Sequence, residues 1–174
     1  MNKQLPTREQ AIQLLHETNC SLQVIAHCEG VAKLARETAE VAFEKGFKVD
    51  VELVEIGALL HDIGRSQTHS VDHAIAGAKI AAEKGLPEEV AAIIKRHVGG
   101  GITKEEARDL GWPEDEYMPV TLEEKIVSYA DKLVETFERV PIEDTIDRLR
   151  KEKMFDAAER VIRLNREITN IIGA

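Results

Sequence analysis

The chain has 174 residues, of which 43% are hydrophobic and 32% charged, a composition that fits one folded domain and excludes a disordered chain. Its formal net charge of −9 argues against a nucleic acid polymer as partner, because neutralising phosphates requires Lys and Arg. We expect no membrane partner either, since no apolar run reaches the roughly 18 residues of a transmembrane helix.

Apolar residues recur with helical spacing along nearly the whole chain. Residues that favour helix starts precede most of these stripes, namely Thr7, Ser21, Asp50, Ser70 or Asp72, Pro87, Thr103 and Thr121. Glycines follow several of them, at Gly46, Gly64, Gly85, Gly99–Gly101 and Gly111. The pattern therefore predicts a succession of helices with short connections.

The last third of the chain continues this pattern. Thr121 and Glu124 predict a capping box for a helix that carries apolar residues as far as Phe137, and one or two further helices are expected from about Ile142 to Ile172. No alternating run is long enough to predict a strand. The expected fold is all-α, a single domain of seven to nine helices over residues 1–174.

Titratable residues lie inside several of the apolar stripes, at His27, His61, Asp62, His73, His97 and Asp131. Each alone has an ordinary explanation, such as a hydrogen-bonded core histidine. Burying an unpaired carboxylate costs several kcal/mol, and no Lys or Arg shares these stripes. The combination therefore indicates one or two divalent ions of Mn, Fe, Co, Ni or Zn, because imidazole with carboxylate suits these metals.

These residues resemble the signature of the HD superfamily of metal-dependent phosphohydrolases. The central motif is HDIGR, residues 61–65, preceded by His27 and followed by Asp131 within SYADKL. The stretches DHAIAGAKIA and IIKRHVGG, with His73 and His97, resemble those that hold a second metal in dinuclear members. The match covers about residues 20–138, and the expected helices of residues 141–174, which match no family motif, would pack on this core.

The resemblance implies a metal site and a reaction, the hydrolysis of a phosphate ester or anhydride by a metal-activated water. His27, His61, Asp62 and Asp131 would bind a first metal, and Asp62 would bridge to a second held by His73 and His97. Arg65 stands where Lys is frequent in dinuclear members and would neutralise charge on a phosphoryl oxygen. His69 would contact the substrate or act as an acid. The expected substrate is small, phosphorylated and nucleotide-like.

Some interpretations stay open at this stage. A nucleotide-sensing HD domain without turnover and a diiron oxygenase are alternatives to the hydrolase. Lys132, beside Asp131, is interpreted as a solvated surface residue, and Gly99–Gly101 either ends a helix or admits a substrate. Two cysteines without CxxC spacing and the lack of a signal peptide predict free thiols and a cytoplasmic protein. A homodimer is left open.

Overall fold

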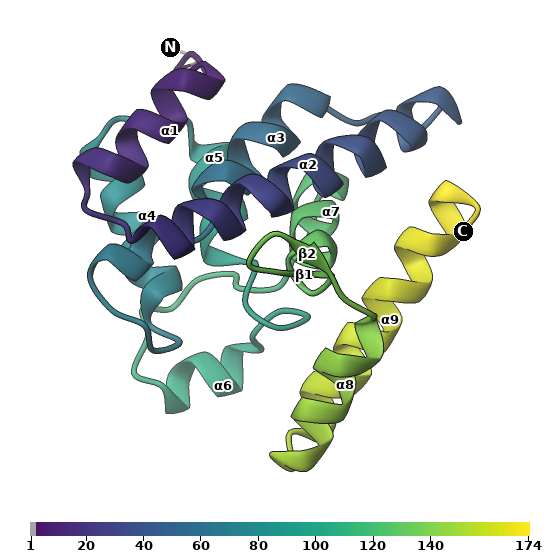
Figure 1. The fold of residues 1–174 in the computed structure, drawn as a ribbon. Coiled ribbons are helices and arrows are strands. Elements are labelled where there is room, and N and C mark those ends of the chain that lie inside the picture. The colour runs from purple at the N-terminus through teal and green to yellow at the C-terminus, as the bar shows by residue number, and fades with distance from the viewer. Residues whose placement is uncertain (1–2) are drawn as a thin grey trace.

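The computed structural model describes residues 3–174 and contains nine α-helices, one short 3₁₀-helix and a small hairpin (Figure 1). The elements are α1 (Arg8–Glu17), α2 (Leu22–Glu44), α3 (Val51–Leu60), η1 (Ile63–Ser66), α4 (His73–Glu83), α5 (Glu88–Lys95), α6 (Lys104–Asp109), α7 (Leu122–Asp131), β1 (Val134–Glu135), β2 (Glu138–Arg139), α8 (Ile142–Lys151) and α9 (Phe155–Ile172). The all-α prediction is confirmed. None of the helices in residues 3–174 combines the length and apolarity needed to cross a membrane.

Local capping explains most of the helix starts. Thr7 and Thr121 each accept a hydrogen bond from the backbone of the residue three positions on, whose side chain bonds back, so the predicted capping box at Thr121 is confirmed and Thr7 forms a second one. Ser21 and Asp50 cap α2 and α3 as expected. Asp72 precedes α4 but makes no capping hydrogen bond, and its Oδ1 instead accepts one from the indole nitrogen of Trp112 at 2.7 Å.

The expected continuation of α7 to Phe137 is wrong. The helix ends at Asp131, and β1 pairs antiparallel with β2 around Thr136, which has a positive φ of 54°. The hairpin packs on α2 at Gly30, where an added Cβ would lie 3.0 Å from Val134 Cγ1 and 3.2 Å from the Thr136 carbonyl oxygen. Val134 is buried through this tertiary contact, which helical spacing alone does not reveal.

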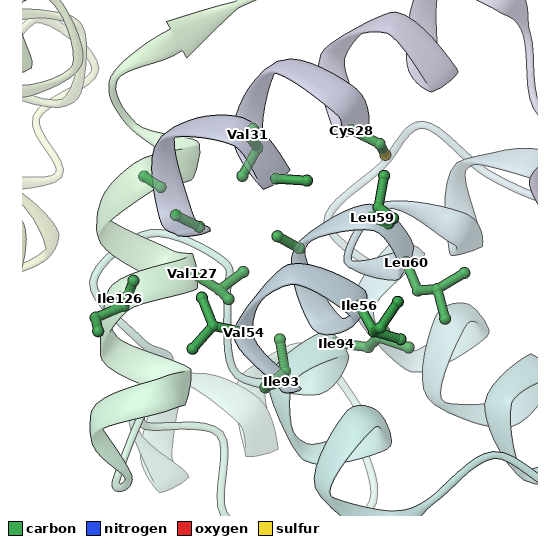
Figure 2. Packing of buried hydrophobic residues seen from close by; sticks show 14 of the residues in the cluster. Cys28, Val31, Val54, Ile56, Leu59, Leu60, Ile93, Ile94, Ile126 and Val127 are labelled. Atoms are coloured by element: carbon green, nitrogen blue, oxygen red, sulfur yellow. The ribbon is translucent and has the colours of Figure 1, made fainter. Parts of the chain in front are cut away.

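The core forms around α3, which contacts α1, α2, α5 and α7. Figure 2 shows its side chains meeting those of three neighbouring helices, in a cluster that includes Val54, Leu59 and Leu60 of α3, Val31 of α2, Ile93 and Ile94 of α5, and Ile126 and Val127 of α7. Cys28, also in this cluster, and Cys20 are buried free thiols. The carboxyl end of α3 is therefore surrounded on several sides.

The last two helices form an antiparallel pair along one side of the molecule (Figure 1). Their facing sides share a small apolar cluster of Ile142, Ile146, Leu149, Ala157, Ala158 and Val161. Further along α9, Leu164 and Ile168 belong to the main core. Arg160, only 8% exposed, donates to the Gly101 carbonyl oxygen at 3.1 Å and to Glu106 at 2.8 Å, which fixes the pair against the segment after α5.

Candidate metal centre

The six predicted ligands converge, although they come from five separate parts of the chain. His27 lies on α2 and Asp131 ends α7, while His61 and Asp62 follow α3 directly. His73 begins α4, and His97 comes two residues after α5. His61, Asp62, His73 and His97 are at most 4% exposed. The fold thus encloses four imidazoles and two carboxylates in one place.

One half of the cluster is built around Asp131. Its Oδ1 lies 2.9 Å from Nε2 of His27 and 3.2 Å from Nε2 of His61. The same two ring nitrogens lie 3.7 and 3.6 Å from Oδ2 of Asp62. His27, His61 and Asp131 can therefore offer their ligand atoms to a single ion, with Asp62 beside them.

The other half is built around the second oxygen of Asp62. Its Oδ1 lies 3.2 Å from Nε2 of His73 and 3.3 Å from Nε2 of His97, and these two nitrogens are 3.0 Å apart. This Oδ1 is buried and has no hydrogen-bond partner in residues 3–174. Asp62 thus directs one oxygen to each half, which is the arrangement a bridging carboxylate requires.

The histidine tautomers show why the cluster fits a cation. In His61, His73 and His97 the Nδ1 atom lies 2.6–2.7 Å from the carbonyl oxygen of the residue three positions earlier. A carbonyl can only accept, so Nδ1 carries the proton and Nε2 of the neutral ring is a bare acceptor. Two such nitrogens and a carboxylate oxygen then face one another without a donor, and a bound cation resolves their repulsion.

The electrostatics favour the ligating protonation state at His97 and Asp131, whereas at His61, although burial opposes it, the Asp62 carboxylate raises the pKa well above its ordinary value. Complete burial lowers the pKa of His97 to about 4, so its ring stays neutral at physiological pH. Burial opposes ionisation of Asp131, but the Lys132 ammonium and the neighbouring histidines hold the pKa of that carboxyl well below its usual range. Neutral imidazole and ionised carboxylate are the forms that bind divalent metals.

Lys132 is not the solvated surface residue expected from the sequence. It is 7% exposed, and its Nζ donates to the carbonyl oxygens of His97 and Ser128 at 2.8 and 3.0 Å and to Asp131 Oδ2 at 3.1 Å. This fixes Asp131 so that Oδ1 faces the histidines. Its position next to a predicted ligand was the only signal of this role in the sequence.

Arg65 and His69 occupy different positions relative to the cluster. Arg65 lines the cavity that opens onto the cluster, and its Nε donates to Asp62 Oδ2 at 3.0 Å and its Nη1 to the His69 carbonyl oxygen at 3.1 Å. The side chain of His69 is exposed and is not among those lining the cavity. The catalytic roles suggested for both residues stay predictions.

The cavity has a volume of about 660 Å³. His27, Asp62, His73, His97 and Asp131 form one part of its wall, and residues of α8 and α9 form another. Gly99 and Gly101 also line it, whereas α5 already ends at Lys95, so the glycine run borders the cavity and does not end the helix. A volume of this size matches those of small-molecule sites, which span roughly 300–1,000 Å³.

Comparison with solved structures supports the fold. The HD domain of the phosphodiesterase PgpH from L. monocytogenes, in complex with cyclic-di-AMP, superposes with a TM-score of 0.61 and 18% sequence identity over 93% of this chain and 92% of that one. The same domain without the nucleotide gives a TM-score of 0.59.

Sequence comparison finds archaeal relatives over nearly the full length of this chain. Uncharacterized protein MJ0778 of Methanocaldococcus jannaschii is 48% identical over 94% of this chain and 98% of its own length. The tRNA (cytidine(56)-2'-O)-methyltransferase of Picrophilus torridus is 40% identical over 98% of this chain, which spans only 49% of that enzyme. The HD domain family matches residues 24–135, which contain all six converging residues. The chain therefore belongs to the HD domain family.

Proposed function

We propose that this protein is a metal-dependent phosphohydrolase that cleaves a phosphate ester or anhydride of a small nucleotide-like substrate. The proposal depends on one observation, the convergence of the Nε2 atoms of four histidines on the two oxygens of Asp62. The donor set suits one or two divalent ions of Mn, Fe, Co, Ni or Zn. When bound, such ions lower the pKa of water and polarise phosphoryl oxygens.

The protein's own groups would hold and orient the reactants. Asp62 offers one oxygen to each half of the cluster, and Lys132 fixes the orientation of Asp131. Arg65 uses Nε and Nη1 within the protein, whereas its Nη2 makes no hydrogen bond within residues 3–174. That nitrogen is available to donate to a phosphoryl oxygen as negative charge develops there.

The relatives support a nucleotide-like substrate. The PgpH domain forms a complex with cyclic-di-AMP, and ribonuclease Y of Thermobifida fusca is 42% identical over 49% of this chain and 16% of its own length. The net charge of −9 favours a small molecule over a polymer, and the cavity volume lies in the range of small-molecule sites. The tRNA methyltransferases share the domain as half of a longer chain, so RNA belongs among the substrates tested.

The test combines metal content with phosphate release. The protein is stripped with a chelator, reloaded separately with each candidate metal, and assayed on p-nitrophenyl phosphate, bis-p-nitrophenyl phosphate, nucleoside phosphates, cyclic dinucleotides and tRNA. Asp62→Ala is expected to lose both metal and turnover. Asp147→Ala, which removes an exposed carboxylate of α8 outside the cavity, is the matched control and is expected to keep both.

Other results would point elsewhere. Tight nucleotide binding without release of phosphate from any substrate would contradict the hydrolase and favour a sensing domain. Bound iron, oxygen consumption and no phosphate release would favour a diiron oxygenase. Retention of full activity by Asp62→Ala would refute the assignment of the site itself.

A further inference from the structure

Part of the cavity wall comes from α8, which lies beyond the family signature in sequence. Four side chains of α8 line the cavity, and Glu152 follows at the end of the helix. They share one helix face because they recur at intervals of three to four residues. The four are Asp144, Thr145, Arg148 and Leu149. All lie beyond residue 135, where the family match ends. The helix is held in place by its apolar contacts with α9, to which Leu149 also contributes, and by Thr145, whose hydroxyl lies 3.4 Å from the Lys132 carbonyl oxygen.

Four cationic side chains line the cavity, and three of them are occupied by the protein itself. Lys132 donates to three oxygen acceptors, and Arg160 to Gly101 and Glu106. Arg65 holds Asp62 and the His69 carbonyl. Arg148 alone makes no side-chain hydrogen bond or ion pair with any residue in the described part of the chain. Its five N–H donors are free for a ligand.

The charge around Arg148 identifies the kind of ligand. Asp144 and Glu152 lie four residues before and after it on the same face, so the stripe carries one positive and two negative charges. A net negative stripe does not suit a second phosphate group. It offers donors from the guanidinium and acceptors from the carboxylates, which suit a neutral group that has both kinds of partner.

Apolar surface lies beside these polar groups. Leu149 comes directly after Arg148, and Met154, which is 48% exposed, lines the same cavity from the turn between α8 and α9. A flat group with polar edges and apolar faces fits this combination of side chains. Nucleobases have this chemistry: their edges carry N–H donors and carbonyl or ring-nitrogen acceptors, and their faces are apolar.

We propose that the stripe of Asp144, Arg148 and Glu152 on α8 is the subsite that binds the nucleobase of the substrate and sets base preference. The inference rests on the proposed phosphohydrolase, in which the metal cluster would hold the phosphate end in the same cavity. Arg148 donates to a carbonyl or ring nitrogen of the base, and the flanking carboxylates accept from its N–H groups. α8 therefore determines which nucleotide is bound without contacting the reacting phosphate.

The test separates base binding from hydrolysis. Adenosine, guanosine, cytidine and uridine, which carry no phosphate to hydrolyse, and ribose are titrated into the metal-loaded full chain, and binding is followed by ligand-observed NMR. The wild type is expected to bind at least one nucleoside more tightly than ribose. Arg148→Gln is expected to weaken that binding at least tenfold, and Glu152→Gln to weaken it as well. Arg150→Gln, an exposed arginine of α8 outside the cavity, is expected to leave it unchanged.

Hydrolysis of p-nitrophenyl phosphate, which has no base, provides the second readout. Its kcat/KM is expected to stay within twofold of wild type in Arg148→Gln. Nucleoside binding no tighter than that of ribose, or unchanged in both Arg148→Gln and Glu152→Gln, would overturn the base subsite. Equal loss of nucleoside binding and ester hydrolysis would assign Arg148 to the metal-side machinery instead. Failure of the wild type to hydrolyse any ester would refute the proposed function alone, because the nucleoside titration needs no turnover.

Discussion

Replacing Lys132 with Met tests whether a buried ammonium group orients the metal ligands. Lys132 is 7% exposed and donates to two carbonyl oxygens and to Asp131 Oδ2, and Met is similar in length but carries no charge or donor. Removing one partner of a buried ion pair costs about 3–5 kcal/mol, because the remaining carboxylate loses its only full positive charge and keeps the histidines alone as partners. For a chain of this size that loss corresponds to a fall in Tm of about 6–20 °C.

The matched control is Lys125→Met on α7, the helix that ends directly before Lys132. Lys125 also forms an ion pair, with Glu167 of α9 at 2.7 Å, but these side chains are 26% and 46% exposed. Exposed pairs of this kind contribute about 1 kcal/mol or less, so its Tm is expected to fall by about 4 °C at most. Thermal unfolding of the metal-free proteins measures both. Equal losses of Tm in the two variants would refute the assignment of Lys132 as a buried positioning residue.

Three further predictions concern the cluster and its surroundings. A divalent metal at 100 times its Kd is expected to raise Tm by about 5–11 °C, an effect that EDTA or Asp62→Asn abolishes; a wild-type Tm insensitive to every candidate metal would contradict it. Because the pKa of His97 is about 4 in the folded protein, against an ordinary value of 6.5, the unfolded chain binds the proton first as pH falls. In urea unfolding of the metal-free protein, the free energy of unfolding is therefore expected to be highest above pH 6.5 and to fall by about 3 kcal/mol as the pH is lowered to 4. His97→Gln is expected not to show this loss. Gly64→Ala is expected to lower the free energy of unfolding by about 3 kcal/mol or more, because the new Cβ would overlap the His73 carbonyl oxygen. Its control, Gly85→Ala, has a φ of +67° and no atom within 4 Å of the new Cβ, and is expected to lower it by about 1 kcal/mol. Similar losses in the two variants would refute the packing explanation.

The sequence predicted two kinds of feature: those that depend on local chemistry, such as helix caps, and polar residues that stand out against the apolar pattern around them. Capping residues such as Thr7, Ser21 and Thr121 mark helix starts by hydrogen bonds within four residues, so the chain itself contains the signal. The ligands were recognisable because a carboxylate or imidazole inside an apolar stripe requires a partner. Asp131 is the clearest case, since Val127 precedes it by one helical turn.

The features that the sequence did not reveal depend on distant parts of the chain. Val134 has helical spacing from Val127 and Asp131, yet it enters a strand because the hairpin fits against Gly30 of α2, more than a hundred residues earlier. From the sequence alone, Lys132 is expected to be solvated like any other lysine. Only the structure places the His97 carbonyl oxygen beside it. The α8 wall of the cavity likewise became visible only in the structure, which places residues of this helix in the same cavity as the metal ligands.

The two halves of the metal cluster are brought together by the backbone immediately after Asp62. The chain turns there into η1, and the absence of a side chain at Gly64 lets η1 pack directly on α4, with Gly64 against the His73 carbonyl and the Gly77 backbone nitrogen. This close approach places His73 within 3.2 Å of Asp62 Oδ1, while Oδ2 stays with His27 and His61. A larger residue at position 64 would separate η1 from α4 and draw the two histidine sets apart. The glycine of the HDIG motif is therefore a packing requirement of the second half of the cluster, and its substitution is expected to affect binding of metal by His73 and His97 before it affects the ligands around Asp131.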